Sequence, residues 1–341
     1  MDKADRRQMS FYDEVYERMV PADHPLRLLD QVINWRKFRK TLRKLYRENG
    51  RPAHNGTMML KLTVLQFLYD LSDRQLEDAA RDRISFRWFC RIDPLESPPD
   101  YTAFCRFRER LGPETFKRIF DKIVRQASDS GLIVDKLSIV DATDIKARVD
   151  IYKLDKPGGK RDGCRLGKGG GPDPDARWGK KSDNKPIHGY KAHASMDDGS
   201  EIVTEIEVTP ANVHDGKAFE LVHDEYAEAV TADKAYDSAE NIGRIRDAGQ
   251  FPAIIVKKKR GKKRGHVSDR YTNVECQRYY RLRKRRPRVE HKFAEAKLWH
   301  GMRQARYWGL GKVRSQVYLT AIALNLKRMV KLGFGVSFSP A

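Results

Sequence analysis

Cysteine is scarce in this sequence, and long apolar runs are missing. Four cysteines occur among 341 residues, and no two of them form a Cys-x-x-Cys pair. This spacing argues against a disulfide framework or a zinc ribbon and fits a reducing compartment. No apolar run approaches the roughly 18 residues of a membrane-spanning helix, so no membrane partner is expected. The opening segment MDKADRRQMSFYDE lacks the apolar core of a signal peptide, so we expect a cytoplasmic protein.

Glycine is crowded into one segment, but not in the order of a phosphate-binding loop. Seven of the fourteen residues from 158 to 171 are glycine, and Lys, Asp and Pro are frequent from Arg148 to Lys185. None of these glycines spells GxxxxGK(S/T), so a nucleotide-binding loop of that kind is not expected. A polar, glycine-rich composition without apolar periodicity predicts a flexible insertion over residues 148–186.

Acidic residues are outnumbered by basic ones. Lysine and arginine total 68 against 47 aspartates and glutamates, which leaves a formal net charge of +21. Hydrophobic residues make up 40% of the chain, so it has enough apolar surface to fold, and the excess charge points to a polyanionic partner. Composition alone does not separate DNA from RNA or from an acidic membrane surface.

More than half of the excess charge lies in one segment. Residues 257–288 contain 15 basic and two acidic side chains. We interpret the segment as a basic loop that follows a phosphate backbone. The phosphate contacts are expected from Lys257, Lys258, Lys259 and Arg260. The tyrosines of this segment either stack on bases or pack within the protein, and they are Tyr271, Tyr279 and Tyr280.

The first part of the chain has the apolar spacing of helices. Asp30 to Glu48 carries apolar residues at helical spacing with basic residues between them, and this predicts one amphipathic helix. The nearly all-apolar run from Met58 to Tyr69 predicts a buried helix. Ser72-x-x-Gln75 is a capping-box pattern that predicts the start of the next helix.

An arginine-rich helix is predicted over Tyr101 to Leu111, closed by Gly112. It carries Arg106, Arg108 and Arg110. Short helices with tight turns and one arginine-rich helix favour a helix-turn-helix-like DNA-binding domain over residues 1–128, with base contacts among these arginines. An ordinary small helical bundle has the same pattern, so that alternative stays open.

After Gly131 the pattern changes from helical to strand spacing. An apolar stretch within residues 132–147 runs into VDATD and predicts a buried strand. Alternating apolar residues on both sides of Asp198-Gly199 predict a β-hairpin.

Short strands and helices then alternate along the chain. Residues 229–232 predict a strand that ends at Asp233, residues 238–248 predict a helix, and residues 251–256 predict a further strand. This order predicts a mixed α/β sheet, and hence a second, α/β domain over residues 129–341.

Three carboxylates stand at positions suited to metal chemistry. Asp141 and Asp233 each follow a predicted strand, and Glu290 lies in the predicted helix RVEHKFAEAK. If the strands are adjacent, the carboxylates meet, and they offer the oxygen ligands that Mg²⁺ takes together with water and phosphate oxygens. Thr143 shares the strand face of Asp141, whereas Asp144 points to the opposite face. A lone aspartate at a strand end is more often a turn or cap residue.

Two cations accompany Glu290. Pro287 suits the first position of a helix, which puts Arg286 just before the helix and near the glutamate. Lys297 follows Glu290 by two helical turns and therefore lies on the same face. The arrangement suits phosphates that flank a metal site, although a simple intrahelical charge pattern has the same spacing.

Three further side chains have two interpretations each. Trp178, in the predicted insertion, either stacks on nucleic acid or anchors its own loop. His193 and His214 lie near the predicted sheet, where a structural histidine is commoner than a metal ligand.

Several motifs occur together in one order along the chain. VDATDIK surrounds Asp141, TPANVHD surrounds His214, TADKAYDS surrounds Asp233, and RxxxExxxxxxK surrounds Glu290. DPDARWGKK before YKAH and the N-terminal GRPAHNGTMMLKLTVLQFLYDLSDRQLE belong to the same pattern. Over residues 10–332 the chain resembles the DDE transposases of bacterial insertion sequences, in particular the insertion-sequence-five-type branch.

The resemblance implies an RNase H-like catalytic domain in which Asp141, Asp233 and Glu290 bind Mg²⁺, with Mn²⁺ as a substitute. It implies an enzyme that binds terminal inverted repeats, cleaves phosphodiester bonds and joins the 3′-OH end to target DNA. The implied partner is double-stranded DNA, bound by a homodimer or higher oligomer associated with the bacterial nucleoid. Related sequences carry a tyrosine where Arg283 stands, so a role specific to that tyrosine does not transfer.

Two other functions share part of this pattern. A decayed or domesticated relative would keep DNA binding without catalysis, but the presence of all three carboxylates argues against it. A structure-specific nuclease of the RNase H-like fold is the second alternative, and the helical N-terminal domain with the basic segment favours binding to specific DNA ends instead.

Overall fold

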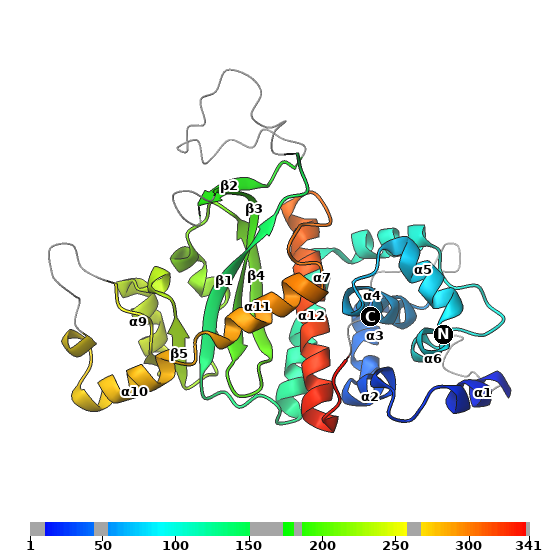
Figure 1. Ribbon diagram of the computed structural model, residues 1–341, viewed down its shortest axis with the longest axis horizontal. Coiled ribbons are helices and arrows are strands. Elements are labelled where there is room, and N and C mark those ends of the chain that lie inside the picture. The colour runs from blue at the N-terminus through cyan, green and yellow to red at the C-terminus, as the bar shows by residue number, and fades with distance from the viewer. Residues whose placement is uncertain (1–10, 44–53, 151–172, 181–185, 258–266, 339–341) are drawn as a thin grey trace, which may run out of the picture. The chain divides into compact units, whose positions relative to one another are not determined.

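The computed structural model describes residues 11–43, 54–150, 173–180, 186–257 and 267–338, which form two compact units (Figure 1). Unit 1 comprises Met1–Asp129 and Leu319–Ala341, and unit 2 comprises Ser130–Tyr318. The first boundary lies where the sequence changes from helical to strand spacing. The last helix, α12 (Leu310–Phe334), contributes to both units, so the C-terminal residues do not all belong with the α/β part. No helix within the described ranges is long and apolar enough to cross a membrane.

Unit 1 is helical. The elements before the first strand are α1 (Phe11–Met19), α2 (Pro25–Val32), η2 (Trp35–Phe38), α3 (Arg39–Arg43), α4 (Gly56–Leu68), α5 (Asp73–Asp82), α6 (Ile84–Cys90) and α7 (Tyr101–Asp129). Helix α4 is buried from Met59 to Leu68, which confirms the predicted buried helix. Ser72 and Gln75 form the predicted capping box at the start of α5.

The single amphipathic helix predicted over residues 30–48 is wrong. The chain leaves the helical conformation at Ile33, and the side chain of Asn34 accepts a hydrogen bond from the N–H of Arg36 to start η2. The N–H of Asn34 donates to the side chain of Gln126 on α7 at 2.8 Å. A local asparagine cap therefore replaces the continuous helix, and residues 44–48 lie outside the described ranges.

Helix α7 is interrupted but does not end at Gly112, where the sequence predicted its close. Gly112 has a positive φ of 65° and breaks the helical geometry, and Pro113 follows it. The chain then resumes helical structure to Asp129. Proline suits the first position of a new helix, so the pair joins two helices instead of opening a loop.

Arg108 of α7 is buried, which corrects the prediction that it contacts bases. Its side chain is 7% exposed. Its two terminal nitrogens each donate to one oxygen of Asp73 at 2.7 Å, and one of them also donates to Gln66 at 3.0 Å. Arg106 and Arg110, on the same helix, are exposed. Arg108 therefore joins α7 to α4 and α5 and is closed to DNA.

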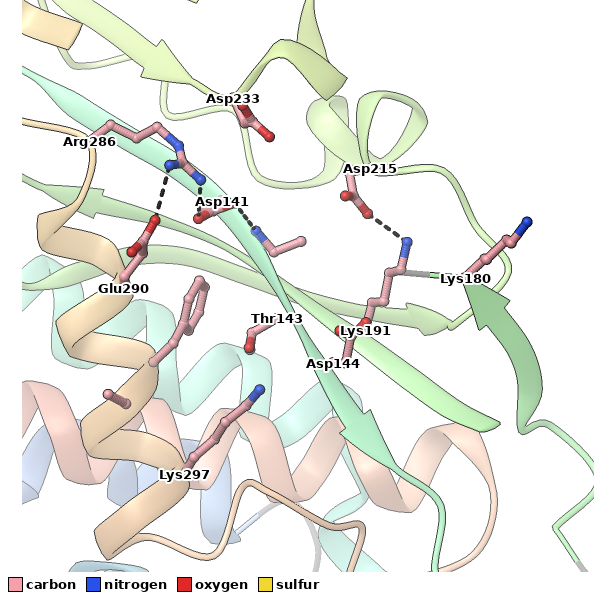
Figure 2. A pocket seen from close by; sticks show the side chains of 13 residues that line it. Asp141, Thr143, Asp144, Lys180, Lys191, Asp215, Asp233, Arg286, Glu290 and Lys297 are labelled. Carbon is pink, nitrogen blue, oxygen red and sulfur yellow. Dashed lines mark hydrogen bonds and ion pairs between the residues drawn. The ribbon is translucent and has the colours of Figure 1, made fainter. Parts of the chain in front are cut away.

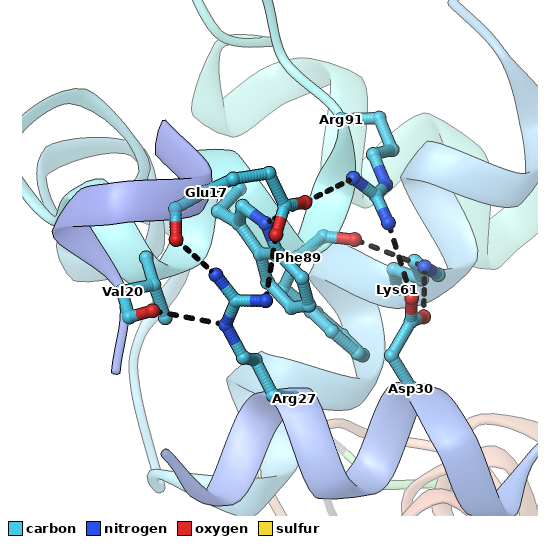
Figure 3. Close-up of polar contacts among 8 residues, drawn as sticks. Glu17, Val20, Arg27, Asp30, Lys61, Phe89 and Arg91 are labelled. Atoms are coloured by element: carbon cyan, nitrogen blue, oxygen red, sulfur yellow. Dashed lines mark hydrogen bonds and ion pairs between the residues drawn. The ribbon is translucent and has the colours of Figure 1, made fainter. Parts of the chain in front are cut away.

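A second buried cation joins the other helices of unit 1. The ammonium of Lys61 on α4 contacts the carboxylate of Asp30 on α2 and the carbonyl oxygen of Phe89 on α6 (Figure 3). Arg91 bridges Asp30 to Glu17 of α1. Burial lowers the pKa of Lys61, and the neighbouring carboxylate of Asp30 opposes that shift. Polar contacts thus tie together helices that are distant in the sequence.

Unit 2 contains a mixed sheet with helices. Its elements are β1 (Ser138–Lys146), β2 (Arg177–Lys180), β3 (Pro186–Asp197), β4 (Val203–Pro210), η3 (Asp215–Leu221), β5 (Ala229–Ala232), η4 (Lys234–Tyr236), α9 (Ala239–Asp247), β6 (Phe251–Pro252), η5 (Val267–Asp269), α10 (Asn273–Arg283), α11 (Arg288–Trp299) and the first part of α12. The mixed α/β sheet, the β3–β4 hairpin, strand β5 and helix α9 confirm the sequence predictions. Strand β6 is shorter than the predicted strand over residues 251–256.

The sheet has the order β2-β3-β1-β5-β6, and β4 also pairs with β3. Strand β3 is antiparallel to β1, β2 and β4, whereas β1, β5 and β6 are parallel to one another. A buried apolar cluster joins Val140 of β1 and Val230 of β5 to Phe219, Tyr236 and Ile245. Helix α11 packs on β1 (Figure 1). The central strand β1 is therefore held between strands on both sides.

Part of the predicted flexible insertion is a strand. Residues 177–180 form β2 and pair with the first residues of β3. A Cβ atom at Gly179 would lie 2.3 Å from the carbonyl oxygen of Ala211, so only glycine fits this close approach. The sequence around β2 is polar and rich in glycine, which is why composition predicted a flexible insertion here instead of a strand. Residues 151–172 and 181–185 lie outside the described ranges.

The basic segment 257–288 is only partly a loop, because α10 occupies residues 273–283. Thr272 and Glu275 form a capping box that starts α10. Tyr271 and Tyr279 are 5% and 0% exposed and stack on each other, so neither is open to bases, whereas Tyr280 is exposed. Lys258, Lys259 and Arg260 lie outside the described residues.

Candidate active site

Asp141 and Asp233 each follow the last paired residue of the parallel β1–β5 ladder. Strands β1 and β5 pair up to Val140 and Ala232. Strand β1 continues along β3 to Lys146, so Asp141 lies within β1 and not at its end as the sequence predicted, whereas Asp233 directly follows β5. The carboxyl ends of adjacent parallel strands meet at one edge of a sheet, where open α/β sheets place their ligand sites. The pairing therefore explains why two carboxylates 92 residues apart in the sequence share one site.

Backbone N–H groups orient both aspartates. Asp141 Oδ1 accepts from the N–H of Ala142 at 2.9 Å, and Asp233 Oδ1 accepts from the N–H of Lys234 at 2.7 Å. Asp233 is thereby the cap residue of η4. Each carboxylate uses one oxygen to fix its own direction, so the protein orients both groups before any ligand arrives.

Glu290 and Arg286 are brought in by the start of α11. The Arg286 guanidinium donates from one nitrogen to Asp141 Oδ2 and from the other to Glu290 Oε1, both at 3.0 Å (Figure 2). Its side chain is 20% exposed, as against 15% for Asp141 and 57% for Glu290. Pro287 precedes the helix, so Arg286 lies near the glutamate as the sequence predicted. One cation thus connects carboxylates from β1 and α11.

These groups line a cavity of about 590 Å³. Its acidic lining residues are Asp141, Asp144, Asp215, Asp233 and Glu290. Its basic lining residues are Lys180, Lys191, Arg286 and Lys297. The cavity therefore brings the three predicted carboxylates together with the two predicted cations, and it adds charged residues that the sequence analysis did not connect.

The two faces of β1 both reach this cavity. Thr143 lines it, as predicted from its shared face with Asp141, and Asp144 lines it as well, although strand alternation predicted that it points away. Beyond Val140, β1 stays paired with β3 on one edge, but the edge that faced β5 has no partner strand in the described residues until the bridge of Lys146 with Gln304. The cavity lies along this stretch of strand edge, so residues from both faces contribute.

Crowding of negative charge perturbs Asp141. Burial, together with the neighbouring charges of Asp233 and Glu290, raises the pKa of Asp141 from the ordinary 3.8 to about 6. The guanidinium of Arg286 and the N–H of Ala142 oppose this rise. Strongly shifted carboxylates in a cleft are candidates for function, and here the main cause is burial, with neighbouring negative charge adding to it.

The donor set fits a hard divalent cation. Three carboxylates line one cavity, and a guanidinium already bonds to two of them, so positive charge is favoured at this position. In the described residues, no three His, Cys, Asp or Glu side chains are close enough to enclose an ion.

The remaining predicted site residues lie in different surroundings. Lys297 lines the cavity from α11, and Lys257 is exposed at the end of the described segment after β6. Trp178 is half-buried on β2 with its ring 5.1 Å from that of His188. His193 is fully buried and bonds to Thr209 at 2.9 Å, which matches the structural interpretation of this histidine.

Lys191 and Asp215 are charged cavity residues that the sequence analysis missed. The Lys191 ammonium lies 2.8 Å from Asp215 Oδ1 (Figure 2). His214 accepts a hydrogen bond from the N–H of Gly216 and caps η3, of which Asp215 is the first residue. The signal was present in the YKAH and TPANVHD motifs, but only the fold shows that these motifs meet.

Two family models match this chain. The model described as "Transposase domain (DUF772)" matches residues 14–110, within unit 1. The model described as "Transposase DDE domain" matches residues 134–326, which is more than half of the chain and includes all three carboxylates.

A solved structure also shows similarity. It is described as a cryo-EM structure of the piggyBac transposase synaptic complex with hairpin DNA. The match covers 99% of this chain and 79% of that chain at 11% identity, with a TM-score of 0.35.

Proposed function

Because this chain belongs to the DDE transposase family, we propose that Asp141, Asp233 and Glu290 are its catalytic triad. The protein is a transposase of the insertion-sequence type, an enzyme that cleaves DNA and transfers a strand. The observation that carries the residue assignment is one cavity lined by carboxylates from β1, from the residue that follows β5 and from α11. The order of the motifs favours the insertion-sequence-five-type branch.

The strand order supports an RNase H-like fold for unit 2. β1 is central, with the antiparallel strands β3 and β4 on one side and the parallel strands β5 and β6 on the other. The resemblance of the motifs implies this fold, and Asp141 and Asp233 occupy neighbouring positions in it, directly after the β1–β5 ladder.

DDE transposases use divalent metal ions, and we assign Mg²⁺ to this site, with Mn²⁺ as a substitute. The ligands would be Asp141, Asp233 and Glu290, because magnesium prefers a few carboxylates, several waters and substrate phosphate oxygens. A bound cation of this kind activates the attacking oxygen and stabilises the leaving oxygen of a phosphodiester.

The protein's own side chains orient the carboxylates and the DNA. Ala142 and Lys234 fix the two aspartates through their N–H groups. Lys297 lines the cavity two helical turns after Glu290 and is assigned to a DNA phosphate. Arg286 bonds to Asp141 and Glu290, and its planar guanidinium is also suited to a DNA phosphate.

Unit 1 is assigned to the terminal inverted repeats. The matched transposase domain covers α1 to α7 up to residue 110, and Arg106 and Arg110 are exposed on α7. Backbone contacts are assigned to Lys257, Lys258, Lys259 and Arg260, and stacking on DNA to the half-buried Trp178. A mobile element has two ends, so we expect a homodimer or a higher oligomer on DNA.

The triad is tested by Asp141→Asn. Cleavage of a duplex that carries the terminal repeat should fall at least about 10³-fold, about 4 kcal/mol of barrier at 1.36 kcal/mol per decade. Affinity for the uncut duplex should stay within about twofold, because the substituted group is a metal ligand and the isosteric amide still accepts a bond from Arg286.

Asp144→Asn is the matched control, since Asp144 lines the same cavity but is outside the triad. Metal-dependent cleavage by Asp141→Asn near the parental rate would refute the assignment. An equal loss in both variants would show that the cavity's charge matters but the triad is misassigned.

A further inference from the structure

Two motifs that the triad does not use converge on one side of the cavity. YKAH lies on β3 and includes Lys191, and TPANVHD ends at Asp215, the first residue of η3. The Lys191 ammonium donates to Asp215 Oδ1 at 2.8 Å and to the carbonyl oxygen of Val213 at 3.1 Å. Both charged residues line the cavity that contains the triad (Figure 2).

The segment that carries Asp215 is held close to the triad. The N–H of Gly216 donates to His214 Nδ1 at 3.1 Å. A Cβ atom at Gly216 would lie 2.6 Å from the carbonyl oxygen of Ala235 in η4, the element that begins directly after Asp233. This close approach requires glycine and fixes the distance between the turn and the triad. Asp215 therefore has a defined position from which to hold Lys191.

The ion pair is poorly explained as a stabilising contact alone. The Lys191 side chain is 14% exposed and that of Asp215 is 30% exposed, so both charges are largely withdrawn from water. Desolvation of this kind offsets much of the attraction within a pair. A lysine ammonium has three N–H donors. Asp215 and Val213 take two of them, which leaves one for a group that enters the cavity.

The group that needs such a donor is a phosphate. Five carboxylates line the cavity, so a phosphodiester entering it is repelled except where cations hold its flanking phosphates. Lys297 supplies one such cation from α11. Figure 2 shows Lys191 and Lys180 away from Lys297, on β3 and β2. A DNA strand that crosses the triad therefore meets positive charge on both sides.

We propose that Lys191 binds a phosphate of the DNA strand beside the scissile phosphate, on the β3 side of the cavity, and that Asp215 is the positioning residue for its ammonium. The site takes a phosphodiester group and reads no base. The assignment rests on the proposed function, because it presumes that the strand to be cleaved lies across the triad.

The test measures binding of a pre-cut duplex, so that it needs no cleavage by the protein. A terminal-repeat duplex ending at the cut site is titrated by fluorescence anisotropy in Mg²⁺, with single neutral methylphosphonates placed at each phosphate near the end. Lys191→Gln should weaken binding of the unmodified duplex about 10-fold, the effect of losing one charge-assisted bond. It should also flatten the log–log salt slope by about 0.9.

The methylphosphonates locate the contact. At one phosphate next to the cut site, neutralisation should weaken the parent about 10-fold and leave Lys191→Gln unchanged, because the bond is already lost. Asp215→Asn should have a smaller effect, about threefold, since the ammonium remains but is held less firmly. Lys191→Arg should recover part of the affinity, which a purely structural role would not produce.

The matched control is Arg244→Gln. Arg244 of α9 pairs with Glu220 of η3 at 2.9 Å in the same unit but does not line the cavity. Its duplex affinity and salt slope should stay parental. Equal losses of duplex affinity in Arg244→Gln and Lys191→Gln would overturn the proposal. So would a loss from Lys191→Gln that adds in full to the loss from the methylphosphonate at every position.

Cleavage kinetics separate this proposal from the proposed function. In the uncut duplex, Lys191→Gln should raise KM and leave kcat near parental, since the contact is present in both ground and transition states. A parent protein that binds but does not cleave would reject the triad and leave the binding result for Lys191 standing. A methylphosphonate scan of the parent that finds no sensitive phosphate near the end would reject the Lys191 contact, whatever the fold of the variant.

Discussion

Arg108 in unit 1 and Arg286 in unit 2 use the same chemistry in different surroundings. Each guanidinium donates from both terminal nitrogens to carboxylate oxygens. The bidentate partner of Arg108 is a single carboxylate, Asp73, and the side chain is 7% exposed. Arg286 divides its bonds between Asp141 and Glu290 at a cavity, and it is 20% exposed.

The contrast between Arg108 and Arg286 shows which features distinguish a structural arginine from one that can bind a ligand. Arg108 completes a closed set of bonds that also includes Gln66, so a ligand has nowhere to enter. Arg286 connects two carboxylates that belong to different elements, and all three groups line a cavity that a ligand can enter. The residue type is the same in the two cases, whereas the number of carboxylate partners and the access differ.

The largest expected effect comes from Arg108→Ala. It leaves the carboxylate of Asp73, which is 28% exposed, without its main partner. Breaking a fully buried pair costs about 3–5 kcal/mol, so we expect a loss of about 3 kcal/mol of unfolding free energy for this partly exposed one. Urea denaturation with and without Mg²⁺ measures the loss, which metal should not restore. Arg110→Ala, exposed on the same helix, should change stability by less than about 0.5 kcal/mol. A loss below about 1 kcal/mol for Arg108→Ala would contradict the structural role.

His193 extends the comparison to a buried polar group in unit 2. Burial lowers the pKa of His193 from the ordinary 6.5 to about 4. On acidification, this histidine is protonated at a higher pH in the unfolded chain than in the folded protein. The free energy of unfolding is therefore unaffected by this group above about pH 6.5. It falls by up to about 3 kcal/mol as the pH falls towards about 4.

His193→Gln should remove that loss. Denaturation midpoints at pH 4.5, 5.5 and 7 should show a smaller acid dependence in the variant than in the parent. His54→Gln, at an exposed position, should keep the parental dependence. Parallel pH profiles of the parent and His193→Gln would disprove this source of acid sensitivity.

The exposed neighbours of Arg108 sharpen the contrast along one helix. Arg106→Ala and Arg110→Ala should each weaken binding to the terminal repeat by about 1–3 kcal/mol and relax sequence preference, without loss of stability. Anisotropy titrations with terminal and random duplexes at one salt concentration measure both quantities. An equal loss for the two duplexes would indicate contacts to phosphates instead of bases.

The smallest effect is expected from Arg286→Ala. In EDTA the variant should lose about 1–2 kcal/mol of stability, because Asp141 and Glu290 then lack the cation between them. Mg²⁺ should restore most of that loss, since the metal takes the same carboxylates. The same addition should leave Arg108→Ala unchanged. Failure of Mg²⁺ to narrow the gap between Arg286→Ala and the parent would argue against metal at this position.

Local patterns predicted the elements whose cause is local. The apolar run of α4, the capping box at Ser72, the alternating residues of the β3–β4 hairpin and the four residues of β5 were all confirmed. Each depends on the spacing of neighbouring residues, which the sequence contains directly. Asp233 directly follows β5 as predicted, whereas Asp141 lies within β1 and not at its end.

Secondary-structure predictions were wrong where the surrounding composition hid a local pattern or where a contact with a distant residue determined the conformation. Asn34 breaks the helix expected over residues 30–48, and its N–H reaches Gln126, far along the chain. β2 exists because it pairs with β3, although its composition is that of a flexible segment. The Thr272–Glu275 capping box that starts α10 was present in the sequence but hidden within a run of positive charge.

Residue order alone predicts the three motif carboxylates, a helical first part and a mixed α/β second part. Packing is what buries Arg108 while Arg106 and Arg110 stay exposed, and it brings Lys191 to Asp215 beside the triad. The physical reason is that burial and pairing depend on which distant residues come into contact. Residue order fixes the local conformation of each segment, whereas the exposure and charge of its neighbours arise only when the segments pack.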